Sequence, residues 1–484
     1  MQGKKTYQEQ LFTSFQLSEH IPQDNFYRRL KDLLEMQWLY KTTRKYYGAE
    51  GQASIDPVVF FKLILIGYLE NQASDRKIVS MASMRLDMLY FIGYNIDEAL
   101  PWHSTLSRTR QLYGEEVFRQ LFRQVLKQCI EKGMVAGRRQ AVDSVFVKAN
   151  ASMDSLLERE ILEDADAYTE SLKEDEDQQG TSHKPQPGNN THYSSTDADA
   201  RIATKPGKPS QLNYLAQVSV DTGCHVITNI EAHHANKRDD ACLAAVIDNT
   251  TNNLQPEGLL IEEIIADTNY SSGTVLQYLE DKNITGYIPT GAYKKDREGF
   301  EYDEQNDEYV CPQGNKLVYK KDVLGRAGRY KKVYYSSSKD CSQCSLRSQC
   351  IGKSSIKKIT ITMDKPLYDK MQARMETPKG KRMMKVRQST VEPVLGTLVN
   401  FLGMKRVNTI GIKQAGKCML MAALAYNLKK LLKFRAPESA IMIKAMENWQ
   451  QMAIKMSFQA LWIIIVHHRI NTSGSLKFSM VNTN

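Results

Sequence analysis

From Arg138 onward, short apolar runs alternate with segments of helical period, and this order constrains the fold of the chain more than any other feature. Short β-branched runs predict strands, and apolar residues three or four positions apart predict helices. In chain order we predict strands at Gln140–Val147, Tyr214–Val220 and His225–Ile230, a helix at Asp239–Asn252, a strand at Gly258–Ala266, a helix at Ser271–Lys282, a strand at Gly286–Pro289 and helices at Pro378–Phe401 and Lys413–Phe434. This is the order of a mixed α/β domain.

The segment before it, residues 26–131, is predicted to be helical throughout. Apolar residues recur at helical spacing in Pro57–Leu69 and in Tyr113–Ile130. Between them, Ser104 is placed to cap a basic helix. A compact helical domain with one basic helix is typical of a helix-turn-helix module that binds DNA ends, and equally of any helical bundle.

Three acidic residues lie where the predicted α/β order would bring them to one edge of the sheet. Asp143 lies inside a strand, where a buried carboxylate costs free energy unless a partner compensates it. Asp267 follows an apolar run, at the strand end where α/β folds bind ligands. Glu392 lies on the late helix. Together they would supply the hard oxygen ligands that a pair of Mg²⁺ ions needs for phosphoryl transfer.

Each acid also has a simpler explanation. Asp143 would cap a turn, Asp267 would cap the helix that starts near Ser271, and Glu392 would pair with Lys385 or Arg387. For any one acid alone the simpler explanation is favoured, and it is the joint placement of the three that favours a metal site.

The charge of the chain is unevenly distributed. The formal net charge is +10, but Asp154–Asp177 contains eleven acids against two bases, so this stretch carries −9 and the remainder +19. From Lys379 to Arg435 there are thirteen Lys or Arg residues and one acid, Glu392. Such a block is typical of a protein that binds a polyanion. The alternative is a solvated cationic surface.

Several motifs resemble those of bacterial insertion-sequence DDE transposases, which have an RNase H-like catalytic domain. Ala141-Val-Asp-Ser-Val-Phe-Val-Lys-Ala-Asn-Ala-Ser is similar to their first-aspartate motif, and Ala266-Asp-Thr-Asn-Tyr to their second. Arg387-Gln-Ser-Thr-Val-Glu-Pro-Val-Leu-Gly-Thr-Leu resembles the helix of the catalytic glutamate, and Ala425-Tyr-Asn-Leu-Lys-Lys the closing helix. Ile55-Asp-Pro and Pro101-Trp-His-Ser-Thr-Leu-Ser resemble the N-terminal domain, so the likeness covers roughly Phe26–Phe434.

The resemblance implies a DNA transposase that cuts the ends of its element and transfers the strands to target DNA. Asp143, Asp267 and Glu392 would be its catalytic residues and the ligands of Mg²⁺ or Mn²⁺, two ions in all. Its partners would be the terminal repeats and target DNA, and it would act as a homodimer or larger assembly. The alternatives are a catalytically inactive, element-derived DNA-binding protein and an RNase H-like nuclease without strand transfer.

The resemblance also suggests which basic residues contact DNA. Relatives carry an Arg before the glutamate and a Lys seven positions after it, where this chain has Gln388 and Val399. We therefore expect neighbouring basic residues to make the phosphate contacts: Lys381, Arg382, Lys385, Arg387, Lys405 and Arg406. Asp239 and Asp240 are reserve candidates for the site, because relatives bring an acid from this region near it. The adjacent His233-His234 pair would form either a metal site or, more simply, part of a polar loop with Asp239 as helix cap.

Eight cysteines are present, and four of them lie close together in sequence. Cys311, Cys341, Cys344 and Cys350 contain a CxxC pair, which is a common half-site for structural zinc. Zn²⁺ held by these four and free thiols are both consistent with the spacing. The others lie in apolar surroundings and are expected in the core: Cys129, Cys224, Cys242 and Cys418.

These signals predict the following domain organisation. Residues 1–135 form a helical DNA-binding domain, and residues 136–292 with 377–436 form the RNase H-like catalytic domain. An acidic insertion at about 158–190 interrupts that domain, a β-rich, cysteine-bearing insertion occupies 293–376, and a tail of unassigned role follows at 437–484.

Targeting signals are absent from the sequence. The first ten residues are polar, and the longest apolar run, Ala460–Val466, is far too short to cross a bilayer. We therefore expect a cytoplasmic protein without membrane association, whose thiols stay reduced.

Overall fold

The computed structural model describes residues 2, 5, 8 and 14–435, apart from 49, 51–53, 160–186, 205–206, 208, 292, 294–298 and 325–329. Met1–Leu432 forms one compact unit and Lys433–Asn484 a second. The predicted tail lies outside the described residues, and so does most of the acidic insertion. None of the described helices is long and apolar enough to cross a membrane.

The N-terminal part is helical, as predicted. Its α-helices are α1 (Leu17–His20), α2 (Phe26–Leu33), α3 (Trp38–Thr43), α4 (Pro57–Leu69), α5 (Asp75–Ser83), α6 (Leu86–Ile92), α7 (His103–Leu112) and α8 (Glu115–Glu131). Asp56 caps α4 by accepting from the amides of Val58 and Val59, with Pro57 in the first turn. The predicted cap at Ser104 is wrong, because α7 begins at His103 and Trp102 is its cap residue. The Ser104 hydroxyl therefore lies within the first turn, where it accepts from Arg108.

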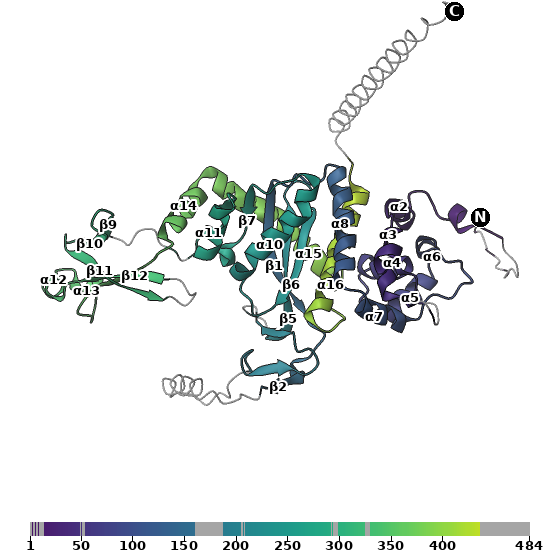
Figure 1. Cartoon of the computed structure of the whole chain (residues 1–484), viewed down its shortest axis with the longest axis horizontal. Coiled ribbons are helices and arrows are strands. Elements are labelled where there is room, and N and C mark those ends of the chain that lie inside the picture. The colour runs from purple at the N-terminus through teal and green to yellow at the C-terminus, as the bar shows by residue number, and fades with distance from the viewer. Residues whose placement is uncertain are drawn as a thin grey trace, which may run out of the picture. The chain divides into compact units, whose positions relative to one another are not determined.

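The central sheet has the strand order and directions of an RNase H-like fold (Figure 1). Its strands are β1 (Arg139–Lys148), β4 (Arg201–Ala203), β5 (Gln211–Asp221), β6 (Ile227–His234), β7 (Glu263–Ile265) and β8 (Thr285–Tyr287). The order is β4-β5-β1-β7-β8, and β6 also pairs with β5. β5 runs antiparallel to β1 and β6, whereas β7 and β8 run parallel to β1. A separate two-stranded ladder joins β2 (Leu156–Glu158) to β3 (His192–Ser194).

Three details of this region differ from the prediction. The strand expected at Gly258–Ala266 is much shorter, because the Glu262 and Glu263 amides both donate to the single Arg138 carbonyl where pairing with β1 begins. The histidine pair lies at the end of β6 and not in a loop. Asp239 is the first residue of its helix, not the cap, and its carboxylate accepts from Gln217 instead.

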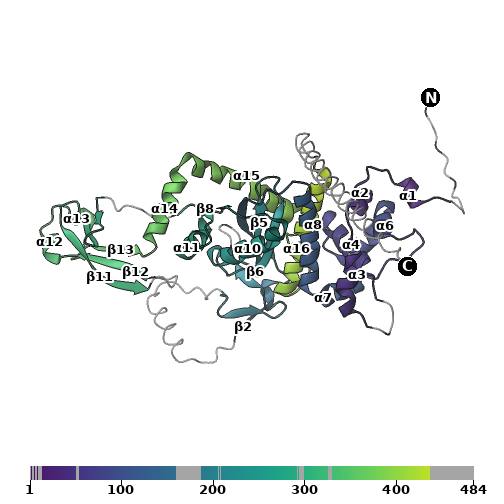
Figure 2. The same ribbon diagram turned by 45° about the horizontal axis from the view of Figure 1, so that its top comes forward.

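Alternate residues of the central strands face different helices. Val142 and Ile264 pack with α10 (Asp239–Leu254) and α11 (Gly273–Asp281) in one buried cluster. Ile265 and Tyr287 pack on Met383, which belongs to α15 (Pro378–Phe401). Figure 2 shows α15 running alongside this sheet. One face of β1 and β7 therefore packs on α10 and α11, and the opposite face packs on α15.

The segment between β8 and α15 is β-rich, but it also contains helices. Five strands pair in the order β13-β12-β11-β10-β9. They are β9 (Glu301–Asp303), β10 (Glu308–Val310), β11 (Lys316–Leu324), β12 (Tyr330–Ser336) and β13 (Lys358–Thr362), with short helices α12 (Ser338–Ser342) and α13 (Arg347–Cys350). The helices of this segment were not predicted, and the longest of them, α14, spans Lys365–Glu376 and buries Met371 against the core beside α10 and α11.

The closing helix α16 (Ile412–Lys433) is fastened to the sheet by one buried side chain. The Asn427 amide donates to the Ile227 carbonyl at 2.8 Å and accepts from the Ile227 amide at 2.9 Å. Asn427 has no solvent exposure. It therefore satisfies both backbone groups at the start of β6, where the ladder with β5 shifts register.

We predict that Asn427→Ala lowers the free energy of unfolding by about 2–4 kcal/mol, since two buried backbone groups lose their partners. Urea unfolding followed by tryptophan fluorescence measures the change. Lys413→Ala, on an exposed position of the same helix, is the control and should shift stability by less than about 0.5 kcal/mol. Equal effects of the two substitutions would contradict the role assigned to Asn427.

Candidate active site

Asp143 and Asp267 come from neighbouring parallel strands. Ala141 of β1 is in register with Ile265 of β7. Two residues further along, Asp143 and Asp267 lie side by side on the same face of the sheet, because side chains of a strand alternate between its faces. This is the face on which Ile265 contacts α15. The strand register thus brings two acids 124 residues apart in sequence to one place.

Asp143 is largely buried and fully hydrogen-bonded. One carboxylate oxygen accepts from the Ser144 amide at 2.7 Å, and the other accepts from Arg387 Nη1 at 2.7 Å. Burial raises the pKa of Asp143 to about 6; the Ser144 amide and Arg387 oppose this rise, and Asp267 adds to it. The site therefore contains a carboxylate whose negative charge the surroundings penalise.

Asp267 begins a short 3₁₀ turn at Thr268–Tyr270 and accepts from the Asn269 amide at 2.9 Å. The alternative that Asp267 caps α11 is wrong, because Ser272 fills that position. Burial raises the pKa of Asp267, the Asn269 amide and Arg387 lower it, and Asp239 raises it further. Arg387 and Asp239 therefore both lie within electrostatic reach of Asp267.

Glu392 lies on α15, and its side chain is 53% exposed. Its carboxylate accepts from Arg387 Nη2 at 3.1 Å. Of the two pairings considered from sequence, Lys385 or Arg387, the structure has Arg387. Because Arg387 also bonds Asp143, a single guanidinium joins a carboxylate of β1 to a carboxylate of α15.

Arg387 bonds two of the three acids, Asp143 and Glu392, and lowers the pKa of the third, Asp267. Its side chain is 12% exposed, less than that of either carboxylate it bonds. It was predicted to bind DNA phosphate, but in this structure it neutralises the acids. A fork of N–H donors that bonds two carboxylates is a geometry that arginine, unlike lysine, can adopt.

Two further residues of this site were not singled out from the sequence. The Tyr270 hydroxyl donates to Gln217, and Gln217 donates to Asp239 at 2.7 Å. Burial raises the pKa of Tyr270, and Asp239, Asp143 and Asp267 add to the rise. The Asp-Thr-Asn-Tyr motif places Tyr270 three residues from Asp267 and was the available signal. Asp240, the other reserve acid, bonds Arg238 at 3.1 Å.

The chemistry of these groups suits a hard divalent cation. The donors are carboxylate oxygens, which Mg²⁺ and Mn²⁺ prefer. Added positive charge would also offset the free-energy cost of burying the Asp143 carboxylate. Among the residues that the structure describes, no group of three or more His, Cys, Asp or Glu side chains is arranged to hold a metal ion. Here the positive charge beside Asp143 and Glu392 belongs to Arg387.

The basic residues that are predicted to bind DNA lie on two segments. Lys381, Arg382 and Lys385 are exposed on α15, the helix of Glu392. Lys405 and Arg406 are exposed on the segment after it, and Arg406 donates to Asn150 at 3.0 Å. That segment runs beside the end of β1, since the Lys148 amide donates to the Lys405 carbonyl.

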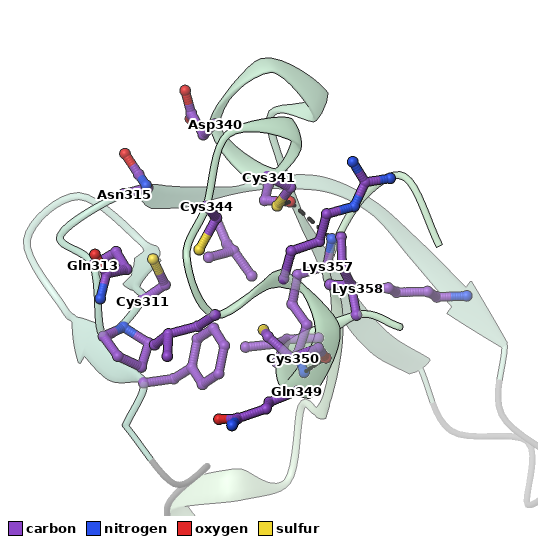
Figure 3. A pocket seen from close by; sticks show the side chains of 18 of the residues that line it. Cys311, Gln313, Asn315, Asp340, Cys341, Cys344, Gln349, Cys350, Lys357 and Lys358 are labelled. Atoms are coloured by element: carbon purple, nitrogen blue, oxygen red, sulfur yellow. Dashed lines mark hydrogen bonds between the residues drawn. The ribbon is translucent and has the colours of Figure 1, made fainter. Parts of the chain in front are cut away.

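The four clustered cysteines line one cavity of about 990 Å³ in the insertion (Figure 3). Cys311 starts a tight turn, in which its carbonyl accepts from the Gly314 amide and Gly314 has a φ of +78°. Cys341, Cys344 and Cys350 come from α12, α13 and the residues between them. All four are half-buried. Of the cysteines expected in the core, three are buried and Cys224 is only half-buried.

Comparisons with known proteins agree on one family. The model described as "Transposase domain (DUF772)" matches residues 15–112, and the model described as "Transposase DDE domain" matches residues 310–432. The first covers α1 to α7, and the second covers most of the insertion, α15 with Glu392, and nearly all of α16. No curated protein matches the chain.

Solved transposase structures are similar only at a low level. The Mos1 transposase paired-end complex with left transposon end is 13% identical, with 56% of this chain and 73% of that chain covered and a TM-score of 0.17. The piggyBac transposase synaptic complex with hairpin DNA is 11% identical, with 84% and 80% covered and a TM-score of 0.23. Scores this low do not bear on the fold.

The identification therefore depends on the two family models, which match separate parts of one chain and describe the same activity. Together with the RNase H-like sheet, they show that this chain is a DDE-type DNA transposase, an enzyme that cleaves DNA and transfers the strands.

Proposed function

We propose that Asp143, Asp267 and Glu392 hold the divalent cations, two Mg²⁺ or Mn²⁺ ions, at which this transposase cuts its element's ends and joins them to target DNA. The observation that supports this most is the Arg387 guanidinium, which bonds Asp143 and Glu392 and acts on the pKa of Asp267. A guanidinium that bonds two of these carboxylates and lowers the pKa of the third marks a place that favours positive charge.

When bound, such ions activate the attacking oxygen and stabilise the leaving oxygen of a phosphoryl transfer. The chain's own residues orient the carboxylates. The Ser144 and Asn269 amides hold one oxygen of Asp143 and one of Asp267. The second oxygen of Asp143 accepts from Arg387, so in this proposal the cation takes the place of that guanidinium. Gln217 holds Asp239 beside Asp267, where it adds negative charge. In this proposal the carboxylates act as metal ligands and the chain forms no covalent intermediate with DNA.

The exposed basic residues near the site would bind the DNA backbone. Lys381, Arg382 and Lys385 lie on the helix of Glu392, and Lys405 and Arg406 lie beside the end of β1. In this proposal residues 1–135 recognise the element's ends, residues 136–292 with 377–436 carry the chemistry, and a homodimer or larger assembly brings two ends together.

The thiol cavity is proposed to hold a structural zinc ion. Four thiolates satisfy tetrahedral zinc and leave no open position for chemistry. The insertion has a small core, in which four residues are buried, Tyr309, Leu317, Tyr334 and Ile359. Metal would stabilise a domain of this kind where apolar burial is limited.

We predict that Asp143→Asn lowers the rate of cleavage of DNA carrying the element's own ends by at least about a thousandfold, because a metal ligand contributes several kcal/mol to the transition state. Binding of the same DNA should change by less than about twofold. A gel that separates cleaved from strand-transfer products measures both steps and distinguishes a transposase from a nuclease. Asp248→Asn, at an exposed acid of α10, is the control. Undiminished cleavage by the Asp143 variant would refute the assignment.

Arg387→Gln should destabilise the metal-free protein by about 3 kcal/mol, because the largely buried Asp143 carboxylate loses its counter-charge. The same substitution should strengthen Mn²⁺ binding, since the ion no longer competes with the guanidinium. Thermal melting without metal and titration calorimetry with Mn²⁺ check the two effects. Lys385→Gln removes an exposed charge from the same helix and should change neither. Weaker Mn²⁺ binding by the Arg387 variant would count against the proposed site.

For the thiol cavity, we expect about one zinc ion per chain in protein purified without chelator, measured by atomic emission. Cys344→Ser should lose most of that zinc and melt at a lower temperature. Cys224→Ser, at a half-buried thiol outside the cavity, should retain it. Wild-type protein that contains no zinc would mean that the four cysteines are free thiols.

A further inference from the structure

The insertion contains a second basic region that is separate from α15. Between Lys316 and Thr362 there are twelve Lys or Arg residues and two acids, Asp322 and Asp340. This stretch alone carries a charge of +10, which equals the net charge of the whole chain. The family comparison assigns it no role beyond membership of the DDE domain.

The strand register gathers several of these bases on one face of the sheet. Across β11, β12 and β13, Lys321 is in register with Val333 and Val333 with Thr360. The neighbouring rows place Lys358 beside Tyr335 and Lys331 between Val323 and Thr362. Residues in register share a face, so the side chains of Lys321, Lys331 and Lys358 lie on the same surface. We call these three lysines the basic face.

Acids are absent from the β11, β12 and β13 positions that form this surface. Asp322 lies in register with Lys332 on the opposite face, where Lys332 bonds Asp307 at 2.8 Å. On the short neighbouring strand β10, Glu308 is already paired with Lys316 at 2.5 Å. Within the described part of the chain, the three lysines of the basic face form no ion pair, and all three are exposed. Their charge is therefore available to a partner.

The basic face lies on the opposite side of the sheet from the small core of the insertion, although Lys358 also lines the thiol cavity. Leu317, Tyr334 and Ile359 point into the small core, and Leu317 and Ile359 also line the thiol cavity. In Figure 3 the side chain of Lys358 extends away from the cysteines. Val333, at the centre of the basic face, is fully buried.

We propose that the basic face binds the phosphate backbone of duplex DNA and gives this transposase a DNA contact remote from its catalytic carboxylates. The partner is DNA because the enzyme's substrate is a polyanion and the face carries three unpaired cations. Contacts to phosphate carry no sequence information directly, so a contact of these lysines with the backbone is independent of sequence. The proposal rests on the function proposed above only in taking DNA as the substrate.

The test is a salt titration of DNA binding by the full-length protein. The triple variant Lys321→Gln, Lys331→Gln, Lys358→Gln is compared with wild type on a fluorescein-labelled duplex of unrelated sequence and on a duplex of the element's end. Each lost phosphate contact reduces the slope of log affinity against log salt by about 0.9. The triple variant should therefore reduce it by about 2–3 on both duplexes and weaken binding by more than about tenfold at low salt.

The control removes the same charge elsewhere. Lys127, Lys132 and Lys282 are exposed and lie outside both basic regions. Changing these three to Gln should reduce the slope by less than about one. A triple variant that folds normally and matches this control would overturn the proposal, and the basic face would then be a solvated surface. A loss confined to the element's end would overturn the claim that the contact is independent of sequence.

The Asp143→Asn protein separates this inference from the proposed catalytic site. It should have the wild-type salt slope, because it retains every lysine. If Asp143→Asn still cleaves DNA while the lysine variant loses its slope, the metal site is wrong and the basic face stands. If Asp143→Asn is inactive and the lysine variant is unchanged, the opposite holds.

Discussion

The placement of one guanidinium among several carboxylates is the interaction on which the candidate site depends. Asp143 and Asp267 lie side by side because of the β1–β7 register, and two carboxylates so close repel each other unless positive charge is added. Arg387 supplies that charge from α15. The helix is in turn anchored by buried apolar residues, including Met383, Val391 and Val394. The packing of α15 on the sheet and the electrostatics of the site therefore stabilise each other.

A second buried cation connects the N-terminal helices to the same framework. Lys417 of α16 is 3% exposed and donates to the carbonyls of Arg110 and Tyr113, at the end of α7. Its ammonium group thus satisfies carbonyls that the helix end leaves without partners. Asn427, on the same helix, bonds the start of β6. One helix near the end of the described chain thus holds both the helical part and the sheet.

Local signals explain which elements could be predicted from the sequence. The bounds predicted for Pro57–Leu69 and Pro378–Phe401 are those observed, because each helix has proline in its first turn and a capping side chain before it. The alternation of periods predicted a mixed α/β order, and the resemblance implied that its sheet is RNase H-like. The prediction failed where tertiary contacts determine an element. The strand expected at Gly258–Ala266 is short because its pairing with β1 begins only at Glu263, after the Glu262 and Glu263 amides donate to Arg138. The apolar residues of α14 are mainly those that contact α10 and α11.

The site was predictable as a set of residues but not as an arrangement. The three acids and Arg387 were singled out, yet whether Glu392 pairs with Lys385 or Arg387 could not be decided from their spacing on one helix. Arg387 bonds a residue 244 positions away, and no periodicity reports such a contact. Tyr270 and Gln217 were missed for the same reason, since their importance comes from lying beside acids of other elements.

The division of the site between distant parts of the chain also has a consequence in time. Asp143 and Asp267 leave the ribosome well before α15, and 125 residues separate Asp267 from Glu392. At about 5–20 residues per second, synthesis of that interval takes roughly 6–25 s. Until Arg387 and Glu392 emerge, the nascent sheet carries two neighbouring carboxylates without the counter-charge that the finished protein provides. With the proposed ligands, the unfinished enzyme therefore lacks one of its three carboxylates and the balance of charge around the other two until α15 has been synthesised.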